Sequence, residues 1–438
     1  MPADPFHLAW FTSFNPPAWN APFAGDIGRE WWTGDYHVDM ARALERAGFD
    51  FIMFEDSTMV SDAYGSTTEM DLKHALHSPK MDPVPLLPVL ARETRHMGFI
   101  ATMSTSFYPP FILARVMATM DHLTRGRVGW NVVTSSEDLA AQNYGMDQLP
   151  PHDERYDRAD EFVEVVKRLW DSWEPSAVVL DAERGVYADH TKVHPLHHVG
   201  KYHKVRGPLN IPAGPQGHPV ICQAGGSPRG KDFAAKHADT ILSALVTVPK
   251  MKAYRDDVRA RAIGHGRSPD DIKVMYIVQP VLGETEAEAQ EKFELTYGLS
   301  RLRIENTLAI ISAVTEVDFM QFDLDSELPE GITTNGHQSI LDDFVARNRG
   351  KTLREALPER SQLGPQLVGT PESVAAQMDE MMQEVGGDGF LIRGESLRSH
   401  SRRYIDEIAS GLAPALRKRG LIRTEYRHPL FRDNLKDF

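Results

Sequence analysis

A glycine-rich turn lies between an apolar run and the start of a helix, where residues 223–231 read QAGGSPRGK. Gly225 and Gly226 would let the backbone approach ligand oxygen atoms, and Ser227 could cap the helix and donate its hydroxyl. Backbone N–H groups and the dipole at a helix N-terminus favour a phosphate dianion. The spacing matches neither the Walker A pattern nor G-x-G-x-x-G. We therefore expect Gly226 and Ser227 to bind a phosphate, with a plain strand-to-helix turn capped by Ser227 as the alternative.

A second group of polar residues begins a helix at residues 150–160, which read PPHDERYDRAD. Proline near the first position and acidic residues in the first turn are typical of a helix N-terminus. His152 and Tyr156 are four residues apart, so they share one helical face and can reach the same ligand. No catalytic residue is assigned from the sequence, but His152 is a candidate because histidine titrates near neutral pH. A capping histidine and a packed tyrosine are the alternative.

Polar residues also follow three apolar runs that read as strands. They are Glu55 and Asp56, residues 102–106 and residues 131–135. In a barrel of parallel strands these positions face one mouth, where polar side chains indicate ligand contacts. Neighbouring carboxylates could also suggest glycoside hydrolysis, but neighbours on a strand point to opposite sides and cannot flank one bond.

Strands and amphipathic helices alternate along the chain, which predicts an α/β fold. The expected strands are residues 7–12, 51–55, 98–103, 127–132, 220–223, 240–244, 272–279 and 389–392. The expected helices are residues 36–47, 110–123, 153–170, 231–237, 249–264, 284–297 and 371–384.

Eight strands with covering helices favour a TIM (β/α)8 barrel, with a doubly wound open sheet as the alternative. We expect one domain over residues 1–438. Two segments interrupt the alternation, about 181–218, which is rich in His, Gly and Pro, and about 311–366, which is polar and irregular. Long connections of this kind sit over the active face of a barrel or in a subunit contact, so we expect insertions that form a lid and a substrate pocket.

Composition excludes several classes of function. The 48 basic and 62 acidic side chains give a formal charge of -14, which disfavours nucleic acid as a partner. No leader and no long apolar run is evident, so we expect a cytoplasmic protein that does not enter a membrane. The single cysteine, Cys222, cannot form an intrachain disulfide. Histidines between His190 and His203 raise the question of zinc or copper, but without a nearby cysteine we expect no metal site.

Motifs spread over nearly the whole chain resemble one family. They are LERAGFD from Leu44, LAR from Leu113, DHLTRGRVGWNVVTS from Asp121, HDERY from His152, GKY from Gly200, GPLN from Gly207, QAG from Gln223, LVGTP from Leu367 and RGLIRTEY from Arg419. Together they resemble the nitrilotriacetate monooxygenase and dibenzothiophene sulfone monooxygenase group of the bacterial luciferase-like, FMN-dependent monooxygenases.

The resemblance implies the large, oxygenating component of a two-component monooxygenase, which uses reduced FMN and O2 to oxygenate a small organic substrate. A separate NAD(P)H-dependent flavin reductase would supply the reduced FMN. The family's FMN contacts would fall on Asp56, Thr102, His152, Tyr156 and Ser227, with Asn131 and Gly226 as additions. At Thr102, a small change of register would exchange the residue with Ser104 or Thr105.

The resemblance also implies a homodimer or homotetramer, and residues 424–438 read as an arm that packs against something. Trp10, Phe11, Phe107, Tyr108 and Trp130 are candidates for an apolar wall around the flavin ring, with core packing as their alternative.

The family's substrates differ widely, so the substrate stays open. Few basic residues gather at the expected pocket, and the candidates are Arg155, Lys201 and Arg229. This favours a neutral or modestly polar organic substrate over a polycarboxylate. Two other functions remain as alternatives, namely a deazaflavin- or flavin-dependent oxidoreductase on the same fold and a flavin-binding protein without turnover.

Overall fold

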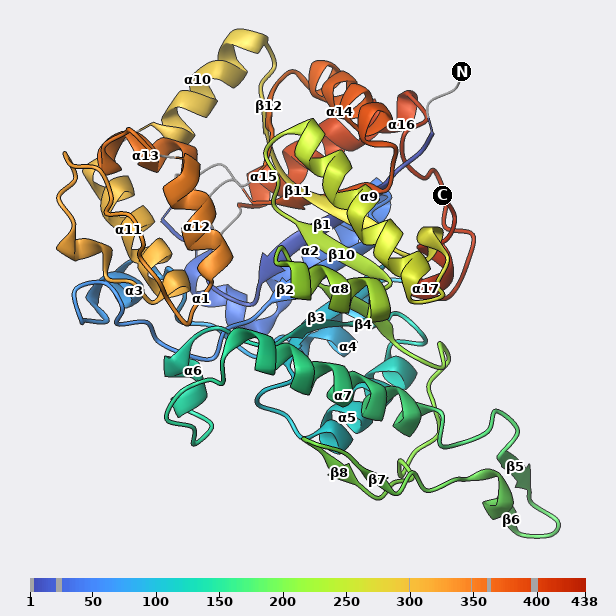
Figure 1. Ribbon diagram of the computed structural model, residues 1–438. Helices are drawn as coiled ribbons and strands as arrows, with labels where there is room; N and C mark the ends of the chain where they lie inside the picture. The colour runs from blue at the N-terminus through green and yellow to red at the C-terminus, as the bar shows by residue number, and fades with distance from the viewer. Residues whose placement is uncertain (1–3, 21–25, 299, 348, 361–363, 395–400) are drawn as a thin grey trace.

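The computed structural model describes residues 4–20, 26–298, 300–347, 349–360, 364–394 and 401–438. Eight parallel strands close into a barrel in the order β1-β2-β3-β4-β9-β10-β11-β13, with β13 paired to β1 (Figure 1). Their bounds are β1 (His7–Ser13), β2 (Phe51–Glu55), β3 (Gly98–Ser104), β4 (Val128–Val133), β9 (Val220–Gln223), β10 (Thr240–Ser243), β11 (Lys273–Leu282) and β13 (Gly389–Arg393). The predicted TIM barrel is confirmed, and the open sheet is excluded.

Helices follow the strands and cover the outside of the barrel. The α-helices are α1 (Ile27–Glu30), α2 (Asp35–Ala47), α3 (Glu69–His74), α4 (Leu86–Glu93), α5 (Pro110–Leu123), α6 (Asp138–Gln142), α7 (His152–Trp170), α8 (Pro228–His237), α9 (Val248–Gly264), α10 (Glu286–Tyr297), α11 (Arg301–Thr315), α12 (Gln338–Arg347), α13 (Leu353–Arg360), α14 (Pro371–Val385), α15 (Arg402–Asp406), α16 (Ala413–Lys418) and α17 (Phe431–Asn434). All seven predicted helices are present. Helix α8 begins three residues earlier than expected, because Ser227 caps it and Pro228 occupies its first position.

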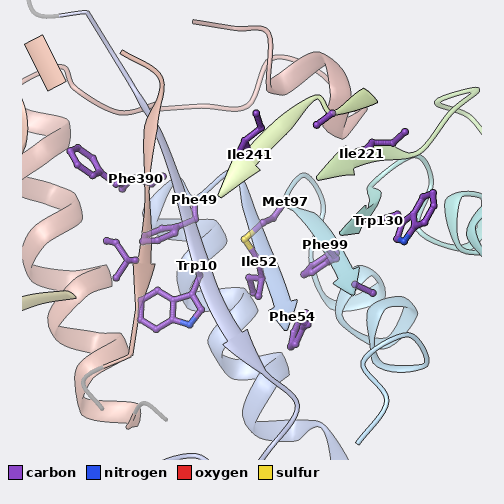
Figure 2. Close-up of a cluster of buried hydrophobic side chains, with 14 of the residues drawn as sticks. Trp10, Phe49, Ile52, Phe54, Met97, Phe99, Trp130, Ile221, Ile241 and Phe390 are labelled. Atoms are coloured by element: carbon purple, nitrogen blue, oxygen red, sulfur yellow. The ribbon is translucent and has the colours of Figure 1, made fainter. Parts of the chain in front are cut away.

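Side chains alternate between two apolar layers along each strand. Trp10, Ile52 and Phe54 point outward and pack under the helices, as Figure 2 shows for the outer layer. Phe51 and Met53 point inward and fill the barrel. Because strands of a closed parallel barrel are buried on both faces, they read as continuous apolar runs, and this made them predictable.

The C-terminal segment closes the end of the barrel opposite the mouth. The ring of Phe431 is fully buried within the inner layer, and a Cβ atom on Gly98 would lie 2.5 Å from it. Arg423 binds Asp50 and Asp437, and its side chain is 2% exposed. Residues 424–438 therefore pack against their own barrel.

The segment 181–218 carries two small hairpins. Strands β5 (Val178–Asp181) and β6 (Val186–Ala188) form one, and β7 (His198–Val199) and β8 (Lys204–Val205) form the other. Figure 1 shows β5 and β6 projecting away from the barrel. The carboxylate of Glu161 anchors the second hairpin by accepting the backbone N–H groups of Tyr202 and His203, each at 2.9 Å.

The segment 311–366 is more regular than its sequence predicts. It begins within the C-terminal part of α11 and contains α12 and α13, in the connection between β11 and β13. A ninth strand, β12 (Gln366–Gly369), pairs with the end of β11 and was not predicted. Residues 348 and 361–363 of this segment lie outside the described residues. Apolar residues that face α11 hold the segment together, including Phe319, Phe344 and Leu357.

Candidate functional site

A cavity of about 2140 Å³ opens at the carboxyl ends of the barrel strands. All seven residues predicted to bind cofactor line it, namely Asp56, Thr102, Asn131, His152, Tyr156, Gly226 and Ser227. They come from β3, β4 and α7 and from the turns after β2 and β9. The parallel direction of the strands explains the convergence, because every strand ends at the same mouth.

Two helix N-termini meet at one side of the cavity. The Ser227 hydroxyl oxygen caps α8 by accepting the Gly230 N–H at 3.0 Å and lies 3.5 Å from Nε2 of His152. His152 begins α7, and its Nδ1 lies 2.8 Å from the Asp153 carboxylate. The Ser227 hydroxyl and the imidazole Nε2 thus both point toward the dipole-positive end of α8, which suits an anion.

The two glycines before Ser227 have different roles. A Cβ atom on Gly226 would meet no heavy atom within 4 Å, so this glycine leaves open space in the cavity lining. A Cβ atom on Gly225 would lie 2.6 Å from Nε2 of Gln223. The Gly225 carbonyl also accepts the Tyr254 hydroxyl at 2.6 Å. Gly225 is therefore needed for packing, and Gly226 alone lets a ligand approach the backbone.

Two buried amide side chains line the cavity, and each has a buried acceptor atom without a partner. Asn131 donates its Nδ2 to the Thr102 hydroxyl at 2.9 Å, and this hydroxyl donates to the Phe54 carbonyl at 2.8 Å. Gln223 donates its Nε2 to the Tyr156 hydroxyl at 3.3 Å. Neither Asn131 Oδ1 nor Gln223 Oε1 has a hydrogen-bond partner. Buried acceptors of this kind are costly unless a ligand satisfies them.

Gln223 was not predicted as a site residue, although it precedes the glycine turn. Its side chain is 2% exposed and lines the cavity beside Tyr156. A glutamine that ends an apolar strand is a signal that could have identified it, because such a polar position at a barrel mouth faces the ligand space.

The acidic pair at the end of β2, Glu55 and Asp56, lines the cavity. Glu55 is the last residue of β2, and Asp56 follows the strand. Glu55 accepts the Ser13 hydroxyl at 2.6 Å and the Lys80 ammonium at 2.9 Å. Burial raises the pKa of Asp56 to about 7; Glu55 and Asp82 add to the rise, and Lys80 opposes it.

Aromatic side chains form part of the wall. Phe11, Phe107 and Tyr108 line the cavity as expected. Trp10 and Trp130 do not, because both point outward from their strands into the layer beneath the helices. The described part of the wall also includes Tyr144, whose ring stacks on Phe107 with 4.3 Å between centroids and 4° between planes.

Arg155 connects the segment 311–366 to α7, the helix that carries His152 and Tyr156. Its Nη1 donates to the Pro150 carbonyl at 2.8 Å and to Asn335 Oδ1 at 3.4 Å. Asn335 and Arg155 both line the cavity. The loop at residues 334–338 therefore forms part of the wall, which sequence patterns did not reveal because the loop lies about 180 residues from Arg155.

Two further properties of the described residues bear on function. No group of three or more His, Cys, Asp or Glu side chains among them is arranged to hold a metal ion. Within the same residues, no helix combines the length and the apolar character needed to span a membrane.

Comparisons with known proteins agree with this geometry. The luciferase-like monooxygenase family matches residues 7–389. The dibenzothiophene-sulfone monooxygenase of Rhodococcus erythropolis is 38% identical over 419 residues, which cover 94% of this chain and 91% of that protein. Component A of the nitrilotriacetate monooxygenase of Aminobacter aminovorans is 38% identical over 411 residues, which cover 91% of this chain and 89% of that protein.

A solved structure extends the similarity to three dimensions. The crystal structure of a riboflavin lyase with modified FMN and the substrate riboflavin is 31% identical and has a TM-score of 0.89. The match covers 99% of this chain and 96% of that chain. The barrel, the family match and the relatives lead to one conclusion: the chain belongs to the luciferase-like monooxygenase family.

Proposed function

We propose that this chain is the oxygenating component of a two-component monooxygenase, which uses reduced FMN and O2 to insert one oxygen atom into a small organic substrate. The observation that carries the proposal is the joint placement, in one cavity, of an anion site at Ser227 and unused buried acceptors at Asn131 and Gln223. The phosphate of FMN would bind at the anion site, and N–H groups of its ring would bind the two acceptors.

The phosphate would lie at the start of α8. The Ser227 hydroxyl, the backbone at Gly226 and Nε2 of His152 would hold it, and the open space at Gly226 permits its approach. Tyr156, 8% exposed and reached by Gln223, would place its ring and hydroxyl beside the same ligand.

The flavin ring would lie deeper in the barrel mouth. Asn131 Oδ1 and Gln223 Oε1 are acceptors, so they suit the N–H groups of a ring rather than its carbonyls. The Thr102 hydroxyl already donates to Phe54 and accepts from Asn131, so we propose that Thr102 fixes the orientation of the Asn131 amide. Asp56 would contact the ring from the neighbouring strand.

When bound, the reduced flavin supplies the electrons that activate O2. The chain's own residues then have three tasks, which are to orient the ring, to exclude water and to control protons. Phe11, Phe107 and Tyr108 would exclude water on the barrel side. The loop at 334–338, tied to α7 through Arg155, would do so on the outer side. His152 can hold a proton at Nε2, the atom that faces Ser227.

We also propose how the chain is organised and which partners it has. Residues 1–438 would work as one domain in which the segment 311–366 covers the mouth. A separate NAD(P)H-dependent reductase would deliver reduced FMN, which is supported by the name of the relative described as component A. Leu180 and Tyr187 on the projecting β5–β6 hairpin are 66% and 65% exposed, which supports a homodimer or homotetramer with this hairpin in the contact.

Anaerobic titration tests the cofactor. Purified protein should bind reduced FMN much more tightly than riboflavin, because riboflavin lacks the phosphate. It should bind a deazaflavin weakly. Binding of FMN and riboflavin with equal affinity would contradict a phosphate site at Ser227. Preferential binding of the deazaflavin would replace the oxygenase with a hydride-transferring oxidoreductase.

The His152 side chain has a matched control in the same titration. Replacement of His152 by alanine should weaken FMN binding about tenfold, as expected for the loss of one hydrogen bond to a charged group. His194, which lies 2.7 Å from Glu174 and does not line the cavity, is an exposed histidine with an acidic partner. His194→Ala should leave FMN binding unchanged.

A further inference from the structure

The cavity has more room and a more apolar outer wall than a flavin alone requires. We propose that the substrate is an uncharged aromatic molecule, which lies between the stacked rings of Phe107 and Tyr144 and the apolar face of α11. This inference rests on the proposed function, because the flavin must occupy the deeper part of the same cavity.

The volume is the first argument. Pockets for small molecules and cofactors commonly enclose about 300–1,000 Å³. The cavity at the barrel mouth encloses about 2140 Å³ and extends from the strand ends to α11 and α12. A flavin placed against Ser227 and Asn131 therefore leaves space for a second molecule of several rings on the outer side.

One face of α11 forms the outer wall. Thr307, Ile310 and Val314 line the cavity from this helix, and their spacing of three and four residues places them on one side of it. Ile340 of α12 adds a further apolar side chain. None of these four side chains carries a charge, so this part of the wall offers apolar contact area.

The ring pair forms another part of the wall. Phe107 follows β3 and Tyr144 follows α6, and their rings are stacked nearly parallel. Tyr144 is 41% exposed although it lines the cavity, so part of its surface remains uncovered. A flat aromatic ring could cover this surface, because offset stacking adds to the energy of burial.

Two basic residues of the cavity, Arg229 and Lys231, are already paired with carboxylates of the protein. Arg229 binds Asp157 at 3.0 Å and also Asp160, and Lys231 binds Asp257 at 3.0 Å. A polycarboxylate substrate would have to displace these internal carboxylates before it gained any charge pairing.

Arg155 is held in a similar way. It donates to Pro150 and Asn335, and it lies in the field of the carboxylates of Glu137 and Glu316. Lys201, considered from the sequence as a basic pocket residue, does not line the cavity and lies over the ring of Tyr202.

Acidic side chains also line the cavity. Glu137, Asp342 and Asp343 are among them, and they would repel a substrate carboxylate. Two more basic side chains line the cavity. Lys250 at the start of α9 is exposed, so water would screen its attraction for an anion, and Arg393 at the end of β13 lies over the ring of Phe11. The charges therefore favour a neutral molecule.

The test compares matched ligands on the protein saturated with reduced FMN under anaerobic conditions. Dibenzothiophene sulfone is the neutral aromatic probe, the same ring system with one added carboxylate is its matched control, and nitrilotriacetate is the polycarboxylate. Calorimetry should show the neutral ring binding at least about tenfold more tightly than either anion. Equal or tighter binding of an anion, or no binding of the neutral ring, would overturn the inference. Failure of reduced FMN itself to bind would instead reject the proposed function, so the two failures are distinct.

Two variants locate the ligand. Tyr144→Ala should weaken binding of the neutral ring about fivefold to tenfold, the size expected for one aromatic contact, and leave FMN affinity unchanged. Ile310→Lys places a cation in the α11 wall and should reverse the preference toward the carboxylated ring. Tyr187→Ala, on the projecting hairpin, is the matched control and should change neither affinity. Unchanged ring binding in both Tyr144→Ala and Ile310→Lys would show that the ligand binds elsewhere.

Discussion

The Ser227 hydroxyl oxygen lies 3.5 Å from Nε2 of His152, although 75 positions separate the two residues in the chain. The pair brings together the N-termini of α7 and α8, which follow β4 and β9, two adjacent strands of the barrel. The N–H groups and dipoles of both helices are thus directed at one point in the cavity. This convergence is the physical basis for a phosphate site.

Substitutions at Ser227 separate capping from phosphate binding. Ser227→Ala removes the cap of α8 and should destabilise the protein by about 1 kcal/mol, and it should also weaken FMN binding. Ser227→Asp keeps a good capping group but places a negative charge at the phosphate site, so stability should be retained while FMN binding is lost. Thermal unfolding and FMN titration of both variants measure the two effects. FMN binding to Ser227→Asp with wild-type affinity would exclude a phosphate at this position.

The open space at Gly226 predicts a different outcome. Because a Cβ atom there would meet no protein atom within 4 Å, Gly226→Ala should leave the thermal midpoint within about 2 °C of wild type. The added methyl group would occupy the approach to the backbone, so FMN affinity should fall at least about tenfold. Gly264→Ala has an equally open surrounding outside the cavity and should leave FMN affinity unaltered. Unaltered FMN affinity in Gly226→Ala would place the phosphate elsewhere.

The raised pKa of Asp56, about 7 against an ordinary 3.8, gives stability a dependence on pH. The folded protein keeps a proton on Asp56 in that interval while the unfolded chain has lost it, so this group's contribution to stability falls as the pH rises from about 4 to 7. Asp56→Asn removes the effect. The difference in thermal midpoint, Asp56→Asn minus wild type, should therefore be more positive by a few degrees at pH 8 than at pH 5.

The control for this pH dependence is Asp62→Asn, at an exposed position on the same loop. Its difference from wild type should be the same at both pH values. A difference for Asp56→Asn that does not change between pH 5 and pH 8 would show that the Asp56 carboxyl titrates at its ordinary pKa.

Substitution of Phe431 should lower stability strongly, although this residue lies far from the cavity. Its fully buried ring closes the barrel interior, so Phe431→Ala should cost about 3–5 kcal/mol of stability, as for other buried phenylalanines. Leu295, 77% exposed on α10, is the matched apolar control, and Leu295→Ala should change stability by less than about 0.5 kcal/mol. Urea unfolding followed by tryptophan fluorescence compares the two. Equal stability of both variants would mean that the C-terminal segment does not seal the barrel.

Sequence patterns predicted the barrel well because its strands are buried on both faces. Phe51 and Met53 point into the barrel while Ile52 and Phe54 point outward, so the whole strand reads as apolar and its ends are marked by polar residues. Those polar ends, at Asp56 and Asn131 among others, then face one mouth by the geometry of the fold. Asp56, Thr102 and Asn131 could be found in this way, whereas His152, Tyr156, Gly226 and Ser227 were found from the patterns at the starts of two helices.

The other features of the fold and the site could not be predicted, because they depend on contacts between distant parts of the chain. The packing of Arg155 against Asn335 joins segments far apart in the chain, and no local pattern reports such a contact. The apolar face of α11 reads as an ordinary amphipathic helix until its position over the mouth is known. The arm expected at residues 424–438 packs under its own barrel, because Phe431 fits the space left by Gly98. Polar residues between 311 and 366 hid two helices that are stabilised by their packing on α11.

Rapid mixing tests the central claim most directly. Protein saturated with reduced FMN under anaerobic conditions is mixed with oxygenated buffer, and the flavin absorbance is followed. If the protein is an oxygenase, the mixture should show a transient spectrum that differs from the spectra of both reduced and oxidised FMN. This transient should decay more slowly than free reduced FMN is oxidised. Ser227→Asp should lose this transient, and Thr285→Ala, at a helix cap outside the cavity, should keep it. Oxidation of the bound flavin at the rate of free FMN, without a transient, would contradict the proposed oxygenase.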